Sequence, residues 1–301
     1  MDFGGHPYSI DHLIAYAETA DRLGFTALAA NDHLVFSVPW LDGPTALAAV
    51  MAHSGAMSLA TTVSLPVVRG PVPLAKTLGA IDRLSGGRMV VAVGPGSSAH
   101  DYEAVGLDFG ERWKRLDEAV QAMRALWREE EEEFSGRFYS TEGITLRPYP
   151  APPFGPPIWI GSWGSDPGLR RVAHLGDGWL ASVYNTTPEL FRDSWDRLRS
   201  HLVSLDKDPE RFPNGLATMW CYITGDSSEA ERIYTERIFP TIDRPQEILR
   251  ERLAIGPAEN FAEKLIAYRD AGVQRVFIWP VGDEIRQLEL FKERVAPQVM
   301  R

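Results

Sequence analysis

Residues 58–96 read SLATTVSLPVVRGPVPLAKTLGAIDRLSGGRMVVAVGPG and contain the clearest secondary-structure pattern of the chain. Residues 58–65 and 89–93 are short apolar runs rich in β-branched side chains, which is typical of buried strands. Between them, residues 72–84 place apolar side chains at helical spacing, and a Ser-Gly-Gly sequence ends that helix. A strand, a helix and a second strand in this order predict two neighbouring strands of a parallel sheet.

The same alternation continues on both sides of this stretch. Further strands are predicted at residues 26–30, 158–160, 178–181, 215–224 and 275–279. Helices are predicted at residues 11–23, 46–57, 111–130, 167–175, 188–205 and 257–271, and others through residue 253. Seven strands therefore stand against the eight that a closed (β/α)8 TIM barrel requires. The missing strand belongs before the helix at Asp11, so we expect a short or missing first strand at Met1–Gly5.

One excursion interrupts the alternation, between the strand that ends at Val93 and the strand that begins at Ile158. Residues 131–157 contain six prolines after position 147, which exclude a helix there, and a short hairpin is expected around Gly136. No internal repeat or low-complexity linker divides the chain. We therefore expect one α/β domain over residues 1–301, with an excursion between barrel strands four and five.

Composition and charge exclude several classes of protein. The chain has 301 residues, of which 44% are hydrophobic, and its net charge is −10, which repels nucleic acid. Its single cysteine, Cys221, has no partner for an internal disulfide bond and is expected to be a small buried side chain. No leader pattern or membrane-spanning apolar run is present, so we expect a cytoplasmic protein without a membrane segment.

In a parallel barrel, function lies in the loops that follow the carboxyl ends of the strands. These loops offer glycines whose N–H groups can approach an anion, aromatic side chains, and a neighbouring aspartate and histidine at Asp32-His33. They contain no Gly-x-Ser-x-Gly elbow, no Walker lysine motif and no His-Glu-x-x-His zinc motif, so no metal site is predicted. The chemistry therefore points to a bound cofactor acting on a small molecule.

Motifs along nearly the whole chain resemble the bacterial luciferase-like monooxygenase superfamily. The matching segments are residues 24–25, 32–33, 68–88, 91–96, 102–106, 111–119, 157–161 and 176–179. The resemblance implies a (β/α)8 barrel that uses reduced FMN or coenzyme F420 for hydride transfer or oxygen insertion, and a homodimer. The Gly94-Pro95-Gly96 loop is similar to that of methylenetetrahydromethanopterin reductases, which favours F420.

The resemblance also implies roles for single residues. It places His33, with Asp32 before it, beside the cofactor ring, where an imidazole can exchange a proton near neutral pH. The alternative is a structural role, in which Asp32 caps the next helix and the His33 side chain only packs against its neighbours. The resemblance further implies a non-proline cis peptide bond between Thr62 and Val63, as a bulge behind the ring.

The remaining predicted contacts are backbone contacts to the cofactor. Gly94 and Gly96, followed by Ser97, would let the chain approach the ring, although such glycines also serve simple turns. The phosphate would meet the N-terminus of a helix at Gly161, Ser162 and Trp163. Trp40, Trp163 and Tyr184 are candidates for an apolar substrate wall or for core packing.

Two departures from the family pattern limit the function. Sugar-phosphate dehydrogenases of the superfamily carry a catalytic glutamate where this chain has Ser97, and Cys221 lies on a later strand than the reactive cysteine of luciferases. The hypotheses are therefore a flavin- or F420-dependent oxidoreductase and, as an alternative, a non-catalytic flavin-binding protein. A hydrolase with paired carboxylates is weaker, because only Asp32 follows a strand directly.

Overall fold

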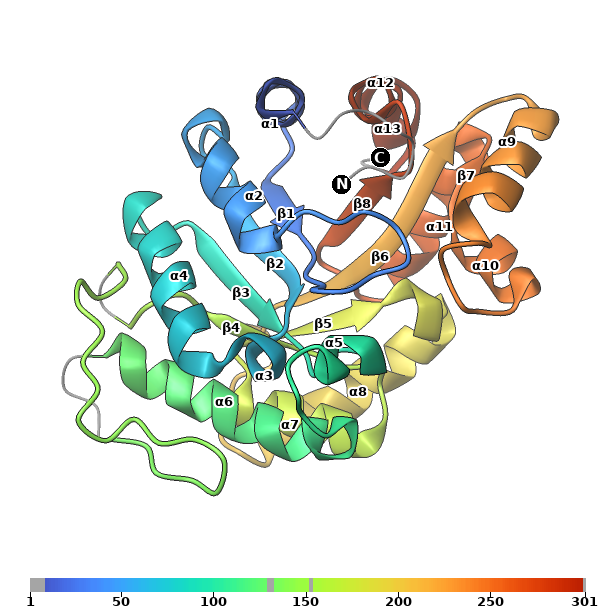
Figure 1. Cartoon of the computed structure of the whole chain (residues 1–301). Helices are drawn as coiled ribbons and strands as arrows, with labels where there is room; N and C mark the ends of the chain where they lie inside the picture. The colour runs from blue at the N-terminus through green and yellow to red at the C-terminus, as the bar shows by residue number, and fades with distance from the viewer. Residues whose placement is uncertain (1–8, 129–132, 152–153, 300–301) are drawn as a thin grey trace.

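The computed structural model describes residues 9–128, 133–151 and 154–299. Within these ranges eight parallel strands form one curled sheet, and helices cover its outer face (Figure 1). The strands are β1 Ala27–Ala30, β2 Ser58–Ser64, β3 Met89–Val93, β4 Ile158–Gly161, β5 Gly178–Ser182, β6 Asn214–Ile223, β7 Ala254–Gly256 and β8 Val276–Pro280. The predicted parallel barrel architecture is confirmed.

The order of hydrogen-bonded strands is β1 to β7, with β8 paired to β6. The long strand β6 makes this possible: β5 pairs with its first residues, β7 with residues 221–223, and β8 with residues 216–221. All seven predicted strands are present within a few residues of their expected bounds. β7 was not expected, because three residues ending in glycine carry no strand pattern of their own.

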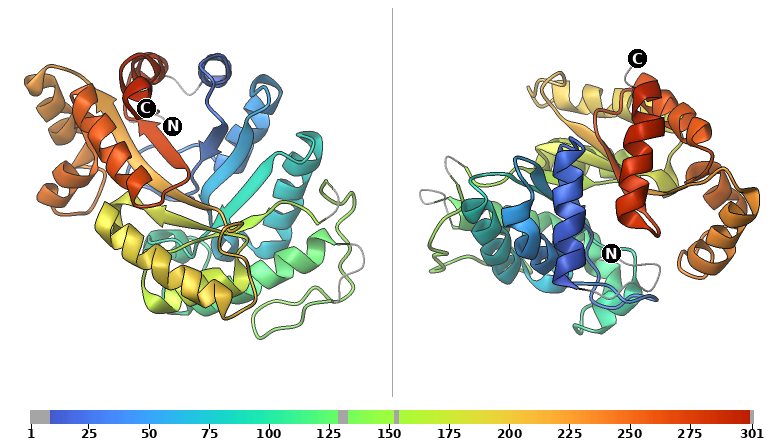
Figure 2. Two further views of the ribbon diagram at one scale, coloured as in Figure 1. Left: turned by 180° about the vertical axis from the view of Figure 1, so that it is seen from behind. Right: turned by 90° about the horizontal axis from the view of Figure 1, so that it is seen from above.

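Strands β1 and β8 face each other without a shared ladder in the described part of the sheet, where α1 packs against α12 (Figure 2). We call this place the seam. Residues from both strands line a cavity of about 150 Å³ there. The predicted first strand at Met1–Gly5 would belong to the seam, and it lies outside the described residues.

The helices follow the apolar spacing of the sequence. In α4, the buried Leu74, Leu78 and Ile81 repeat every three or four residues and pack on the core. The α-helices are α1 Ile10–Arg22, α2 Gly43–Val50, α3 Pro66–Arg69, α4 Pro71–Leu84, α5 Ala99–Glu103, α6 Arg112–Trp127, α7 Asp166–Leu175, α8 Pro188–Val203, α9 Ser227–Ile233, α10 Gln246–Arg252, α11 Ala258–Asp270, α12 Glu284–Leu290 and α13 Ala296–Val299. Short 3₁₀ turns cover Met51–His53, Phe109–Glu111 and Val183–Asn185, and π-helical turns cover Tyr234–Ile238 and Phe291–Val295.

Some boundaries differ from the expected ones. The helix expected at residues 46–57 begins and ends earlier, because Asp42 caps it and a 3₁₀ turn follows Val50. In the excursion, an antiparallel bridge joins Ser135 to Ser140, which confirms the hairpin around Gly136. Cys221 is buried and unpaired, as expected. No helix in the described ranges is long and apolar enough to cross a membrane.

Candidate functional site

One cavity of about 400 Å³ opens at the carboxyl ends of the strands. It lies where a parallel barrel positions its functional loops. All the predicted site residues line it: Asp32, His33, Thr62, Val63, Gly94, Gly96, Ser97, Gly161, Ser162 and Trp163. The loops that follow β1, β2, β3 and β4 therefore converge on one space.

The back of the cavity is an irregular segment of β2. The peptide bond between Thr62 and Val63 is cis, as the family resemblance implied, and the ladder with β3 shifts register at this point. The Asn31 side chain holds the bulge, since its Oδ1 accepts a hydrogen bond of 3.0 Å from the Val63 N–H. Sequence reasoning missed this role of Asn31, although the residue stands directly before Asp32.

Two of the predicted glycines make room for the Val63 side chain. A Cβ on Gly94 would lie 3.0 Å from Val63 Cγ2, and one on Gly161 would lie 3.1 Å from Val63 Cγ1. Gly94 directly follows β3 and Gly161 ends β4, so the valine side chain is held between neighbouring strand ends. These glycines thus shape the wall of the cavity through Val63, a reason that the sequence pattern did not reveal.

His33 forms a hydrogen-bonded pair with Asp101, a residue that sequence reasoning missed. The distance from His33 Nδ1 to Asp101 Oδ2 is 2.8 Å, and the second carboxylate oxygen accepts from the N–H groups of Leu34 and Val35. The Asp101 side chain is fully buried and that of His33 is 12% exposed. Burial alone would raise the pKa of Asp101, but these hydrogen bonds outweigh it and lower that pKa below its ordinary value.

This pairing determines which ring nitrogen of His33 is available. An ionised carboxylate only accepts hydrogen bonds. Nδ1 must therefore carry a proton and donate a hydrogen bond to Asp101. Nε2 has no hydrogen-bond partner among the described residues, and His33 lines the cavity. The imidazole can therefore exchange a proton with a ligand through Nε2.

Asp32, which was predicted to act beside His33, forms an ion pair with Arg69 instead. Its two carboxylate oxygens accept from Arg69 Nε at 2.7 Å and from Arg69 Nη2 at 2.5 Å, and Oδ2 also accepts from the Leu65 N–H. Arg69 further contacts Asp42, which caps α2. Asp32 is 2% exposed and does not cap a helix itself. These contacts tie the loop after β1 to the segment after β2 and leave Asp32 few free lone pairs.

The predicted phosphate segment precedes α7. The Ser162 N–H donates to the Leu180 carbonyl, so this backbone donor is taken by the sheet, whereas the Ser162 side chain lines the cavity. Ser165 caps α7 by accepting from the Gly168 N–H. Trp163 is 56% exposed, and the Arg244 guanidinium lies 5.6 Å from the centre of its ring. An anion at this helix end would meet side-chain donors as well as the helix dipole.

Two buried polar atoms of cavity residues lack a partner in the described structure. They are the Thr62 hydroxyl and the Tyr184 hydroxyl. Burial raises the pKa of Tyr184 well above its ordinary value, so its hydroxyl keeps its proton and remains a donor. Because buried polar groups are rarely left unsatisfied, these two hydroxyls fit a ligand that offers hydrogen-bonding atoms.

The aromatic side chains predicted for a substrate wall lie in different places. Tyr184 and Trp163 line the cavity, whereas Trp40 packs edge-on against His33 at 5.5 Å and also contacts Trp279. Trp279 stacks on Trp220, and both fill the barrel interior. Trp40 therefore supports His33 from the side of the core.

A curled parallel sheet with a cis bulge behind a cavity at its carboxyl end defines an α/β-barrel protein built to bind a ligand there. A family profile described as luciferase-like monooxygenase matches residues 2–243. The chain belongs to this family, as its motifs indicated.

Related proteins align over nearly the full length. The F420-dependent glucose-6-phosphate dehydrogenase of Segniliparus rotundus is 28% identical over 320 residues, which cover 95% of this chain and 93% of the relative. The F420-dependent hydroxymycolic acid dehydrogenase of Mycobacterium tuberculosis is 25% identical and the alignment covers 97% and 85% of the two chains.

Solved structures share the fold. An F420-dependent secondary alcohol dehydrogenase in complex with an F420-acetone adduct has a TM-score of 0.84 at 19% identity, covering 97% of this chain and 96% of that one. The oxygenating constituent of 3,6-diketocamphane monooxygenase from Pseudomonas putida, in complex with FMN, has a TM-score of 0.73 at 18% identity, covering 99% and 96%. These likenesses confirm the luciferase-like barrel.

Proposed function

We propose that this chain is an F420-dependent oxidoreductase that transfers a hydride between the deazaflavin and a small alcohol or carbonyl compound. The observation that carries the proposal is the His33–Asp101 pair on the wall of a cavity backed by the cis bulge. The names of the relatives, which include F420-dependent dehydrogenases, support this cofactor and reaction class.

The cavity residues fit such a coenzyme. The bulge at Val63, with Gly94 and Gly161 beside it, would support a planar ring, and the unpartnered hydroxyls of Thr62 and Tyr184 would meet polar atoms. The segment before α7 would hold the phosphate through the Ser162 side chain and the helix dipole. When bound, F420 supplies the ring carbon that takes up or gives back a hydride.

His33 would handle the proton that accompanies the hydride. When an alcohol is oxidised, its carbon loses a hydride and its oxygen loses a proton, which Nε2 can accept as a general base. In the reverse direction the protonated imidazole returns that proton to the carbonyl oxygen. Asp101 holds the ring in the tautomer that this role requires and stabilises the imidazolium that forms.

The substrate class follows in part from Ser97. A serine lines the cavity where sugar-phosphate dehydrogenases of the superfamily carry a glutamate. A serine hydroxyl does not act as a carboxylate acid or base at neutral pH. We therefore propose that the substrate is an alcohol or carbonyl compound other than a sugar phosphate.

The test is a titration of the purified chain with F420, followed by turnover assays with secondary alcohols, aldehydes, ketones and glucose 6-phosphate. We expect micromolar binding and a substrate-dependent change in F420 absorbance that His33→Asn abolishes. Binding without turnover for the whole panel would favour a flavin-binding protein instead. Substrate-dependent oxygen consumption with reduced FMN, but no activity with F420, would replace hydride transfer by oxygen insertion.

A further inference from the structure

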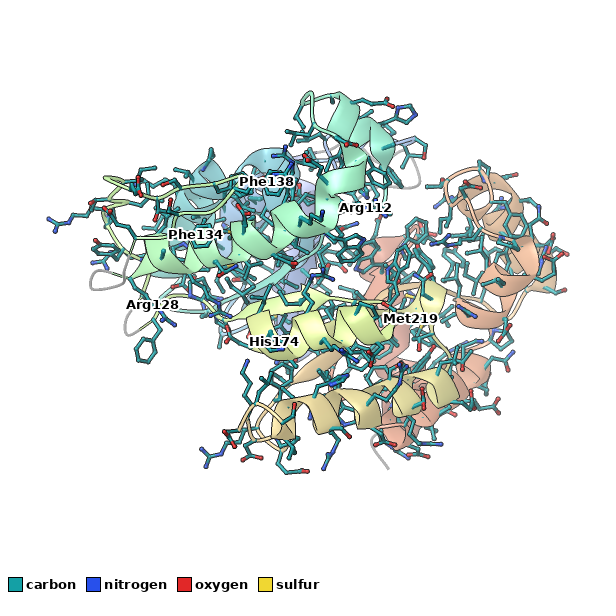
Figure 3. The ribbon with its side chains drawn as sticks, turned by 90° about the horizontal axis from the view of Figure 1, so that it is seen from below. Arg112, Arg128, Phe134, Phe138, His174 and Met219 are labelled. Carbon is teal, nitrogen blue, oxygen red and sulfur yellow. The ribbon has the colours of Figure 1, made fainter. Side chains whose placement is uncertain are left out.

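Two arginines that the proposed mechanism does not use line the same cavity as His33. They are Arg112, the first residue of α6, and Arg244, in the loop before α10. Figure 3 labels Arg112 at the start of its helix. Both side chains are half-buried, so their charges are partly withdrawn from water.

The contacts of these arginines orient the guanidinium groups without neutralising them. Arg112 Nη1 donates to the Phe109 carbonyl at 2.9 Å, and its guanidinium carbon lies 4.1 Å from the centre of the Phe109 ring. Arg244 Nη2 donates to Asn185 Oδ1 at 3.4 Å and its guanidinium lies over Trp163. Within the described ranges neither arginine forms an ion pair with an aspartate or a glutamate.

Other arginines near the cavity behave differently. Arg69 binds Asp32, Arg115 binds Glu111, and Arg171 binds Asp117. Asp32 is the one acidic side chain among the described residues of the cavity wall, and Arg69 already neutralises it. The cavity thus keeps an excess of positive charge in a chain whose net charge is −10.

A second feature beside Arg244 points to the same kind of ligand. The buried Tyr184 hydroxyl lacks a partner in the described structure, and Arg244 acts on it electrostatically. Both residues line the cavity, and a guanidinium and a hydroxyl are donors from which a phosphate or carboxylate accepts hydrogen bonds. Partly buried cations without a counter-charge are unfavourable, so an anion from outside the chain would complete this arrangement.

We infer that Arg112 and Arg244 bind anionic groups, phosphate or carboxylate, of the ligand that fills the cavity. The inference rests on the proposed function, because the anion belongs either to the phosphorylated tail of F420 or to the substrate. Both sources share the same chemistry, and the test below separates them.

The test compares wild type with Arg112→Gln and Arg244→Gln in titrations of F420 and of its phosphate-free ribityl deazaflavin core. Arg286→Gln is the matched control, since Arg286 is an exposed arginine of α12 that pairs with Glu289 and Glu293, and its replacement changes the net charge equally. Inorganic phosphate is titrated into the F420-loaded protein as a probe of an anionic substrate. Arg112→Lys and Arg244→Lys retain the charge if a glutamine variant does not fold.

Three outcomes decide the inference. A loss of about tenfold or more in F420 affinity, with unchanged affinity for the core, places the anion on the coenzyme. Unchanged F420 affinity with a similar loss of phosphate binding to the loaded protein places it on the substrate. If both variants bind F420, the core and phosphate like the control, the inference is wrong.

The failure of the proposed function would look different. Wild type would then bind neither F420 nor its core. Phosphate binding to the unloaded protein would still decide the role of the arginines: a tenfold loss in Arg112→Gln or Arg244→Gln would support the inference. Equal phosphate binding by wild type and both variants, or none by any of them, would overturn it.

Discussion

Asp101 acts on the proposed chemistry only through His33, because it is fully buried and its oxygens are occupied by the imidazole and by two N–H groups. It is a positioning residue. Its contribution is the tautomer of the ring and the negative charge beside it. A substitution of the carboxylate by an amide tests both contributions together.

Replacing Asp101 by Asn removes the charge and keeps the size of the side chain. We expect kcat to fall about 10²-fold, because general acid–base catalysis contributes on that order. The KM of the substrate and the affinity for F420 should stay near their wild-type values, because Asp101 does not line the cavity. Asp177→Asn, which breaks an ion pair with Arg124, is the control and should leave kcat unchanged. An unchanged kcat in Asp101→Asn would refute the positioning role.

The lowered pKa of Asp101 also predicts how stability depends on pH. A carboxyl whose pKa is lower in the folded than in the unfolded state stabilises the fold above its unfolded pKa, about 3.9. That stabilisation is lost as the pH falls through the folded value. Urea unfolding at several pH values should therefore show a wild-type advantage over Asp101→Asn of about 2 kcal/mol at pH 6, shrinking below pH 4. A constant difference across this range would contradict the prediction.

Asp32 is predicted to serve structure more than catalysis. Asp32→Asn leaves Arg69 without its bidentate partner, so we expect a loss of about 3 kcal/mol in the free energy of unfolding. At a temperature where the variant is folded, kcat should stay within about tenfold of wild type. A drop comparable to that of His33→Asn would restore the catalytic role that the sequence suggested for Asp32.

At the scale of single elements, the sequence predicted what local pattern controls. The strands were found because apolar and β-branched residues recur in short runs, and the cis bond at Thr62-Val63 because the family motif marks it. The three-residue β7 and the four-residue α3 are too short to carry a period. Their place is set by packing against longer neighbours.

In the candidate site, too, the sequence predicted the residues set by local pattern and missed those set by long-range contacts. The loop residues around His33 were predicted, since a parallel sheet brings strand ends together. Asp101 was missed because it lies 68 residues from His33, and no spacing rule links them. Arg69 was missed as the partner of Asp32 across 37 residues for the same reason. Pairings of this range depend on the three-dimensional fold.

The strand ends around Val63 leave no space for a larger side chain at Gly94. Gly94→Ala would place a Cβ 3.0 Å from Val63 Cγ2, so the Val63 side chain must give way. We expect F420 affinity to fall about tenfold in a titration, with a cost in stability of about 1–3 kcal/mol from overpacking. The double variant Gly94→Ala/Val63→Ala should recover part of the affinity, because the smaller side chain restores the space. Additive losses in the double variant would contradict a contact between these positions.

At the scale of the whole molecule, the seam between β1 and β8 holds an unusual carboxylate. Glu284 is 5% exposed, and neither of its oxygens accepts a hydrogen bond from the described residues. The His12 imidazole lies beside it, with Nε2 at 3.5 Å from Oε2. A buried carboxylate with so little compensation is expected to cost stability.

Glu284→Gln therefore should stabilise the protein. We expect a gain of about 1 kcal/mol in the free energy of urea unfolding at pH 8, where an amide is cheaper to bury than a charge. Glu289→Gln on the same helix, at a more exposed position, is the control. A loss of stability at pH 8 would mean that Glu284 has a partner at the seam.

The lining of the cavity extends along the chain from Asn31 to Arg244, with contributions from strands β1 through β6 and the loops around them. Such long-range contacts form slowly when a parallel sheet folds, because closing the chain costs entropy before the contacts are gained. No early folding intermediate can then offer the complete site. Coenzyme binding would therefore report that folding has finished.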